Sequence, residues 1–146
     1  MAGLTALSAM RDVAKVQPGQ KVLINGAAGG VGTFAVQIAR AFGTEVTGVC
    51  STTNVDLVKS IGAEHVVDYT REDFTRSEQR YDVILDNVGN HTLSECRRVL
   101  ATHGTLIFNS GKAGFLPIIQ LHLLKPFVGH KLRFFIAKLN NMTWIR

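Results

Sequence analysis

Glycines gathered between an apolar strand and a helical segment constrain this chain more than any other feature. Residues 21–25 read Lys-Val-Leu-Ile-Asn, residues 26–32 read Gly-Ala-Ala-Gly-Gly-Val-Gly, and residues 33–40 continue in a helical pattern. Glycines let a backbone approach an anion closely, and the N–H groups at the start of a helix point toward it. The sequence therefore predicts a strand, a tight turn and a helix that together can hold a pyrophosphate.

The spacing of these glycines gives each position of the turn a role. The pattern G-x-G-x-x-G would place its first position at Ala27, its second at Gly29 and its third at Gly32. Gly26 comes one residue too early, and Ala27 can still make the turn if its backbone angles stay in an allowed region. Gly29 should face the phosphates, and Gly32 should let the helix pack closely on the sheet. The residues expected to contact the pyrophosphate are Ala28, Gly29, Gly30, Val31 and Gly32. The alternative is a glycine-rich turn without a ligand.

Strand patterns and helical segments alternate along the rest of the chain. The strand patterns occur at residues 21–25, 45–50, 65–69, 81–86, 105–109 and 131–137. This alternation predicts an α/β fold, a doubly wound parallel sheet (Rossmann) of about six strands with helices on both faces. Such sheets bind ligands at the carboxyl ends of their strands. The length of 146 residues fits one dinucleotide-binding domain, residues 1–146.

Composition argues against several other classes of function. The net charge of +5 comes from scattered lysines and arginines, so we expect no nucleic-acid partner. No apolar run reaches the roughly 20 residues of a membrane span, and the first residues have no secretory pattern, so we expect no membrane association. Cys50 and Cys96 have no metal-type spacing and the histidines are scattered, which predicts no metal site and no zinc. Free thiols favour a cytoplasmic location.

The residues after the second predicted strand bear on the choice of cofactor. Folds that prefer NAD place an Asp or Glu there, on the ribose hydroxyls. This chain instead offers hydroxyl and amide groups, and no carboxylate, at Ser51, Thr52, Thr53 and Asn54. No acidic group in this stretch would repel a 2′-phosphate, which favours NADP(H) over NAD(H). Lys59 could add a positive charge one turn later, although the alternative is a solvated helix lysine.

Several longer motifs occur in a familiar order. They are Ala-Gly-Leu-Thr-Ala-Leu at residues 2–7, Val-Gln-Pro-Gly-Gln-Lys-Val-Leu-Ile at 16–24, Gly-Gly-Val-Gly at 29–32, Gly-Ala-Glu-His-Val-Val-Asp-Tyr at 62–69 and Asp-Asn-Val-Gly at 86–89. In these motifs the chain resembles the nucleotide-binding domain of a medium-chain dehydrogenase/reductase. Within that superfamily it is similar to the zinc-independent quinone oxidoreductase branch.

The resemblance implies an oxidoreductase that transfers a hydride between NADP(H) and a quinone, enone or other carbonyl compound. It implies that Thr5 lies near the nicotinamide and that Tyr69 lies against the adenosine phosphate. It also implies that Asn87, Val88 and Gly89 lie beside the nicotinamide ribose. The plainer alternatives are a helix cap for Thr5 and a half-buried tyrosine at a strand end for Tyr69.

The family resemblance also bears on assembly and activity. Members of the family carry a GroES-like catalytic domain that is absent from this chain, so we assign no catalytic residue and expect the isolated chain to be inactive. Relatives pair through their last strand, which predicts a homodimer through an edge strand at residues 131–137, with the apolar residues 115–128 over the joint. The alternative function is a non-catalytic nucleotide-binding or dimerisation module. The motifs count against a methyltransferase-like domain.

Overall fold

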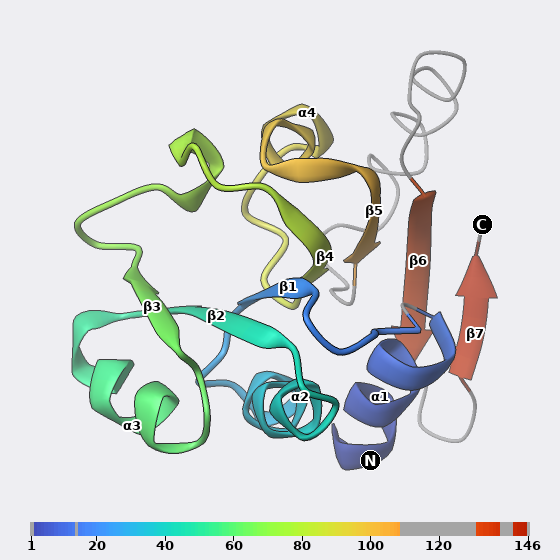
Figure 1. The fold of residues 1–146 in the computed structure, drawn as a ribbon, viewed down its shortest axis with the longest axis horizontal. Helices are drawn as coiled ribbons and strands as arrows, with labels where there is room; N and C mark the ends of the chain where they lie inside the picture. The colour runs from blue at the N-terminus through green and yellow to red at the C-terminus, as the bar shows by residue number, and fades with distance from the viewer. Residues whose placement is uncertain (1, 14, 109–130, 138–141, 146) are drawn as a thin grey trace.

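The computed structural model of the protein describes residues 2–13, 15–108, 131–137 and 142–145 (Figure 1). Its centre is one seven-stranded sheet with the strand order β3-β2-β1-β4-β5-β6-β7. The strands are β1 (Lys21–Asn25), β2 (Glu45–Cys50), β3 (His65–Asp68), β4 (Tyr81–Asp86), β5 (Leu100–Phe108), β6 (Lys131–Ala137) and β7 (Met142–Ile145). The predicted α/β doubly wound sheet is confirmed, because β1 to β6 all pair in parallel.

Helices connect these strands and cover both faces of the sheet. They are α1 (Ala2–Leu7), which continues as a π-helix (Ser8–Val13), α2 (Gly30–Ala41), α3 (Val55–Ser60) and α4 (Leu93–Arg98). Short 3₁₀ turns lie at Thr52–Asn54 and Phe74–Arg76. In Figure 1, α1, α2 and α3 lie on one side of the sheet and α4 lies on the other. Among the described residues no helix is both long enough and apolar enough to cross a membrane.

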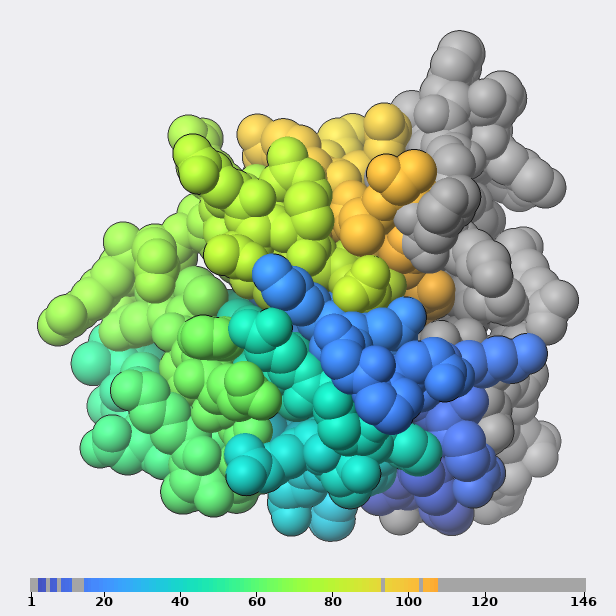
Figure 2. Space-filling model, in the orientation of Figure 1, coloured from blue at the N-terminus to red at the C-terminus, as the bar shows by residue number. Residues whose placement is uncertain are grey.

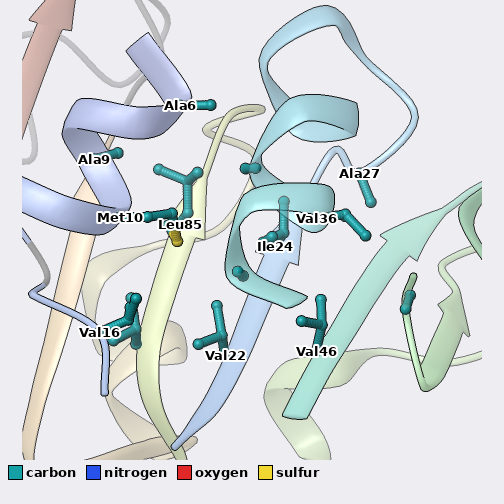
Figure 3. Packing of buried hydrophobic residues seen from close by; sticks show 14 of the residues in the cluster. Ala6, Ala9, Met10, Val16, Val22, Ile24, Ala27, Val36, Val46 and Leu85 are labelled. Atoms are coloured by element: carbon teal, nitrogen blue, oxygen red, sulfur yellow. The ribbon is translucent and has the colours of Figure 1, made fainter. Parts of the chain in front are cut away.

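The core follows from the alternation of side chains along the strands. Val22 and Ile24 of β1 face a cluster formed with Met10, Val36 and other buried residues under α1 and α2 (Figure 3). Leu23, between them, faces the opposite cluster, which includes residues of β4, β5 and α4. A strand buried on both faces must be apolar at every position, which is why residues 22–24 read as an unbroken apolar run.

The order of the strands creates a switch point beside β1. This strand pairs with β2 on one side and with β4 on the other. The strands β2 and β3 extend the sheet in one direction from β1, and the strands from β4 onward extend it in the opposite direction. In the space-filling view the blue part of the chain, to which the buried strand β1 belongs, comes to the surface between teal and yellow-green parts (Figure 2). Parallel sheets bind ligands in the crevice at such a point.

The prediction that residues 131–137 form an edge strand is wrong. β6 pairs with β5 on one side, and β7 pairs with it antiparallel on the other, with Phe134 opposite Ile145 and Ala137 opposite Met142. No element was predicted after residue 139, since a four-residue strand becomes recognisable only through its partner. β7 therefore supplies hydrogen-bond partners from the same chain to the backbone groups on this side of β6. The apolar residues 115–128, expected over a dimer joint, lie outside the described residues.

Candidate functional site

The glycine-rich turn leaves the carboxyl end of β1 by a left-handed step at Gly26, whose φ is +81°. The N–H groups of Gly26 and Ala27 both donate to the carbonyl of Val49 on β2, at 3.1 and 3.0 Å. Ala27 is fully buried and does not have a positive φ. Ala27 thus lies within the turn without a positive φ, as the sequence analysis requires of it. Gly26 takes the left-handed step, because glycine adopts this backbone region without strain.

The other two glycines of the pattern differ in the space around them. A Cβ atom added to Gly32 would lie 2.0 Å from the carbonyl oxygen of Gly26 and 2.9 Å from the Cα of Ala27. The start of α2 thus packs directly on the backbone of the turn. A Cβ atom at Gly29 would lie 3.4 Å from the Gly26 oxygen, which is an ordinary contact. Gly29 precedes α2 and has no side chain that could cap its first N–H groups.

Two hollows open at the carboxyl edge of the sheet. The turn hollow, of about 310 Å³, is lined by Gly26, Gly29, Gly30, Val31, Gly32, Asn87 and Val88. The strand-end hollow, of about 320 Å³, is lined by Asn25, Gly26, Ala28, Gly29, Val49, Cys50, Ser51, Asn54, Tyr69, Val88 and Asn90. The two hollows share Gly26, Gly29 and Val88, so they adjoin each other along the glycine turn.

Most of the predicted site residues meet at these hollows. The exceptions are Thr52, Thr53 and Gly89, which do not line either hollow, and Thr5, whose side chain lies outside the described residues. Val88 lines both hollows, and in the strand-end hollow it shares the lining with Ser51 and Tyr69. The lining residues that the sequence analysis missed are Asn25, Gly26, Val49, Cys50 and Asn90. Asn25 and Cys50 are the last residues of parallel strands, a position that could have identified them.

The polar turn after β2 is held by its own side chains. The hydroxyls of Ser51 and Thr53 are hydrogen-bonded at 3.2 Å, and the Asn54 amide donates to the Ser51 hydroxyl at 3.1 Å. The Thr52 hydroxyl points elsewhere and donates to the carboxylate of Asp68 at 2.5 Å. Ser51 and Asn54 are therefore the members of this turn that face the strand-end hollow.

Asp68 brings a carboxylate to this turn from the neighbouring strand. It lies opposite Cys50 in the register of β2 and β3. Hydrogen bonds from the hydroxyls of Thr52 and Thr70 hold the pKa of Asp68 below its ordinary value, so it is ionised at neutral pH. The stretch 50–54 has no carboxylate of its own, as the sequence shows, but Asp68 contacts it. Asp68 does not line the strand-end hollow.

The loop after β4 is tied to β1 by a buried polar cluster. The Oδ1 atom of Asp86 accepts from the N–H groups of Val88 and Gly89, at 3.0 and 2.9 Å, and from the Asn25 amide at 3.1 Å. The Asn25 amide also donates to the side-chain oxygen of Asn90 at 3.1 Å. Asp86 is fully buried. Residues of this loop line both hollows, with Asn87 and Val88 in the turn hollow and Val88 and Asn90 in the strand-end hollow.

Possible metal ligands and thiols lie partly at the site and partly away from it. Cys50 lines the strand-end hollow, and burial, with a smaller effect of Asp68, raises the pKa of its thiol. Among the described residues two groups could hold a cation: Glu45 with Glu64 and His65, and Asp73 with His91 and Glu95. None of these residues lines either hollow. In the second group, Glu95 already accepts the N–H of Thr92 in a capping box.

Comparison with known proteins identifies the family. A family profile described as zinc-binding dehydrogenase matches residues 30–127. The mitochondrial NAD(P)H oxidoreductase RTN4IP1 of Mus musculus is 46% identical over 96 residues, which cover 61% of this chain and 24% of that protein. The chloroplastic quinone-oxidoreductase QR1 of Triphysaria versicolor is 36% identical over 116 residues, which cover 73% of this chain and 35% of the relative.

Solved structures agree with these sequence relatives. The quinone oxidoreductase of Coxiella burnetii matches 96% of this chain with a TM-score of 0.81 and 30% identity, although the match covers only 43% of that protein. The matched part of the chain thus spans about a quarter to a third of the length of the two sequence relatives and under half of the structural one. It belongs to the zinc-binding dehydrogenase family, and it is the nucleotide-binding domain of a medium-chain dehydrogenase/reductase.

Proposed function

We propose that this domain binds NADP(H), with a preference for NADPH over NADH, as part of an oxidoreductase that reduces a quinone, enone or other carbonyl compound. The observation that carries the proposal is the pair of adjoining hollows along the glycine turn at the switch point of the sheet. A dinucleotide has two nucleoside halves joined by a pyrophosphate, and this arrangement offers two compartments joined by a turn of glycines. The names of relatives such as the quinone oxidoreductases support the reaction class.

The residues of the site fit the parts of such a ligand. Gly29 offers an extended backbone with no side chain between the pyrophosphate and the start of α2. Ser51 and Asn54, which face the strand-end hollow, can donate to the ribose or to its 2′-phosphate. Tyr69, which is 59% exposed, can cover an adenosine from the open side. When bound, the cofactor supplies the hydride, and the protein orients it and limits its contact with water.

The preference for NADPH depends on two kinds of group near the end of β2: polar donors that can bind a 2′-phosphate, and a carboxylate that would repel it. The Ser51 hydroxyl and the Asn54 amide line the strand-end hollow and can donate to a 2′-phosphate, whereas the Asp68 carboxylate does not line it and accepts from the hydroxyls of Thr52 and Thr70. A carboxylate that accepts bonds from its own neighbours is less available to a ribose hydroxyl. We therefore expect the phosphorylated cofactor to bind more tightly.

Titration of the chain with NADPH and with NADH, followed by cofactor fluorescence, tests this proposal. We expect a lower dissociation constant for NADPH. Gly29→Val is the variant that tests the site. The Cβ atom of the valine fits the fold, but its two methyl groups would fill the space where the pyrophosphate meets the backbone. The variant should fold and lose binding of both cofactors. Equal affinities for the two cofactors would remove the preference, and unchanged binding by a folded Gly29→Val would remove the site.

Catalysis by the whole protein is a further part of the proposal. Relatives are more than twice as long as this chain, so we expect the cleft that holds the substrate to need residues outside it. The chain alone should then oxidise NADPH with a simple quinone at a negligible rate, because the substrate is neither positioned nor shielded from water. Turnover at rates usual for enzymes would contradict this. Cofactor binding without turnover in any longer form would favour a non-catalytic nucleotide-binding module.

We also propose that the protein forms a homodimer, as the family resemblance suggests. We propose further that it is located in the cytoplasm, because its two cysteines are free thiols. β7 occupies the side of β6 that was predicted to pair with a second copy. A dimer through residues 131–137 therefore requires β7 to move aside, or the second copy to pair along β7 itself. Light scattering of the purified chain reports the oligomeric state.

A further inference from the structure

The carboxylate of Asp86 is the least explained group near the two hollows. It is fully buried at the end of β4, and it does not line either hollow. Its Oδ1 atom accepts three hydrogen bonds, whereas its Oδ2 atom is buried and accepts none from the part of the chain that the structure describes. A buried carboxylate that is half satisfied contributes little to the stability of a fold. The groups that donate to its Oδ1 atom indicate its role.

We propose that Asp86 is a positioning residue for cofactor binding, which fixes the loop 87–90 as a wall shared by the two hollows. The proposal rests on the proposed function, because the wall matters only if the hollows hold a nucleotide. Asp86 acts on this wall from behind, through the backbone N–H groups of Val88 and Gly89. These two bonds fix the direction in which the chain leaves β4.

Asn25 extends the same cluster to the glycine turn. Its side-chain amide bridges Asp86 and Asn90, and its backbone carbonyl accepts from both the N–H group and the side-chain amide of Asn87 at 3.2 Å. Asn25 is the residue immediately before Gly26. One cluster of side chains therefore ties both ends of the loop to the residue that precedes the turn.

Contact between the loop and the turn is close. A Cβ atom on Gly26 would lie 2.9 Å from the Cγ2 atom of Val88, so the Val88 side chain rests on the bare backbone of Gly26. Val88 lines both hollows at this point. A small movement of the loop toward the turn would narrow both hollows, and a movement away would remove their shared wall. Loss of the Asp86 acceptor leaves two loop N–H groups without their bonds, which forces such a movement.

Asp86→Ala and Asp86→Asn test this role, with Asp82→Ala as the matched control. Asp82 lies near the other end of β4, where its carboxylate accepts the N–H of Lys21 at 2.8 Å, and it lines neither hollow. We expect Asp86→Ala to raise the dissociation constants of NADPH and of 2′,5′-ADP about tenfold or more, from the loss of charge-assisted bonds. Asp86→Asn keeps an acceptor oxygen and should recover most of the affinity. Asp82→Ala should stay within about twofold of the unmutated chain, however far it lowers the melting temperature.

Hydrogen exchange separates failure of this proposal from failure of the proposed function. Whether or not a nucleotide binds, Asp86→Ala should speed exchange at the N–H groups of Val88 and Gly89 while those of β1 and β2 stay protected. Faster exchange in a chain that binds no nucleotide would overturn the proposed function only. A folded Asp86→Ala variant with unchanged exchange at the loop, or with dissociation constants within twofold, would overturn the positioning role. Equal weakening by Asp82→Ala would do the same.

Discussion

Gly32→Ala should destabilise this domain far more than the size of a methyl group suggests. The added Cβ atom would lie 2.0 Å from the carbonyl oxygen of Gly26 and 2.9 Å from two further backbone atoms of the turn, whereas ordinary contacts begin at 3.4 Å. None of these atoms belongs to a side chain that could rotate away. The start of α2 must therefore move off the turn by on the order of 1 Å, and its packing on β1 must move with it.

The magnitude follows from the cost of overpacking. Inserted methylenes typically cost about 1 to 3 kcal/mol, and a backbone obstacle favours the upper end of that range. A loss of about 3 kcal/mol corresponds to a fall of roughly 6 to 12 °C in melting temperature for a domain of this size. Thermal unfolding followed by far-ultraviolet circular dichroism measures the shift, and urea titration gives the free energy of unfolding directly.

Gly29→Ala is the control for this experiment, and it should change stability in the opposite direction. Gly29 has φ −78° and ψ 177°, an extended conformation that any residue adopts, and its Cβ atom would make an ordinary contact. Alanine at such a position restricts the unfolded chain and stabilises by about 0.4 to 1 kcal/mol. A Gly32→Ala variant that melts within about 2 °C of the unmutated chain would refute the close packing of α2 on the turn.

Three further predictions concern other parts of the chain. Burial raises the pKa of the thiols of Cys50 and Cys96, so both should react slowly with iodoacetamide. Cys50 should be labelled slowly, and more slowly still when NADPH fills the strand-end hollow, whereas Cys96 should be labelled only after unfolding. Mass spectrometry measures the labelling of each cysteine. Removal of residues 142–146 should leave the outer side of β6 unpaired and cause association that rises with concentration in light scattering. Glu95 has a pKa below its ordinary value, chiefly because the Thr92 N–H donates to it. Its carboxylate thus stabilises the fold above about pH 4.3 and loses this effect as pH falls, so Glu95→Gln should flatten the acid decline in urea titrations.

Four strands were predictable from the sequence with their bounds. Residues 21–25, 45–50, 81–86 and 131–137 form strands as expected, because unbroken apolar or alternating runs bounded by turn residues have few other solutions. The strand β5 begins at Leu100, five residues earlier than predicted. Its pairing with β4 shifts register between Tyr81 and Val83, and such an irregularity has no local signal in the sequence.

The candidate site was predictable where it depends on local chemistry and not where it depends on register. The role of Gly32 follows from its spacing, but the left-handed residue of the turn is Gly26, since spacing alone does not give backbone angles. Asp68 reaches Thr52 because β2 and β3 pair with Cys50 opposite residue 68. Asn25 and Asp86 meet across two paired strands in the same way. Contacts of this kind exist only after the strands are aligned.

The position of the hollows at the switch point also has a consequence for how the domain folds. Strand β1 pairs with β2 after one helix, but Asn25 and Asp86 are 61 residues apart in the sequence when they meet. Closing that longer loop is the slower event, because chain entropy opposes distant contacts. A folding intermediate made of residues 21–68 would contain the glycine turn without the wall formed by loop 87–90. A nucleotide would bind such an intermediate poorly and would stabilise only the complete domain, so the ligand favours the finished fold over every partly folded form that precedes it.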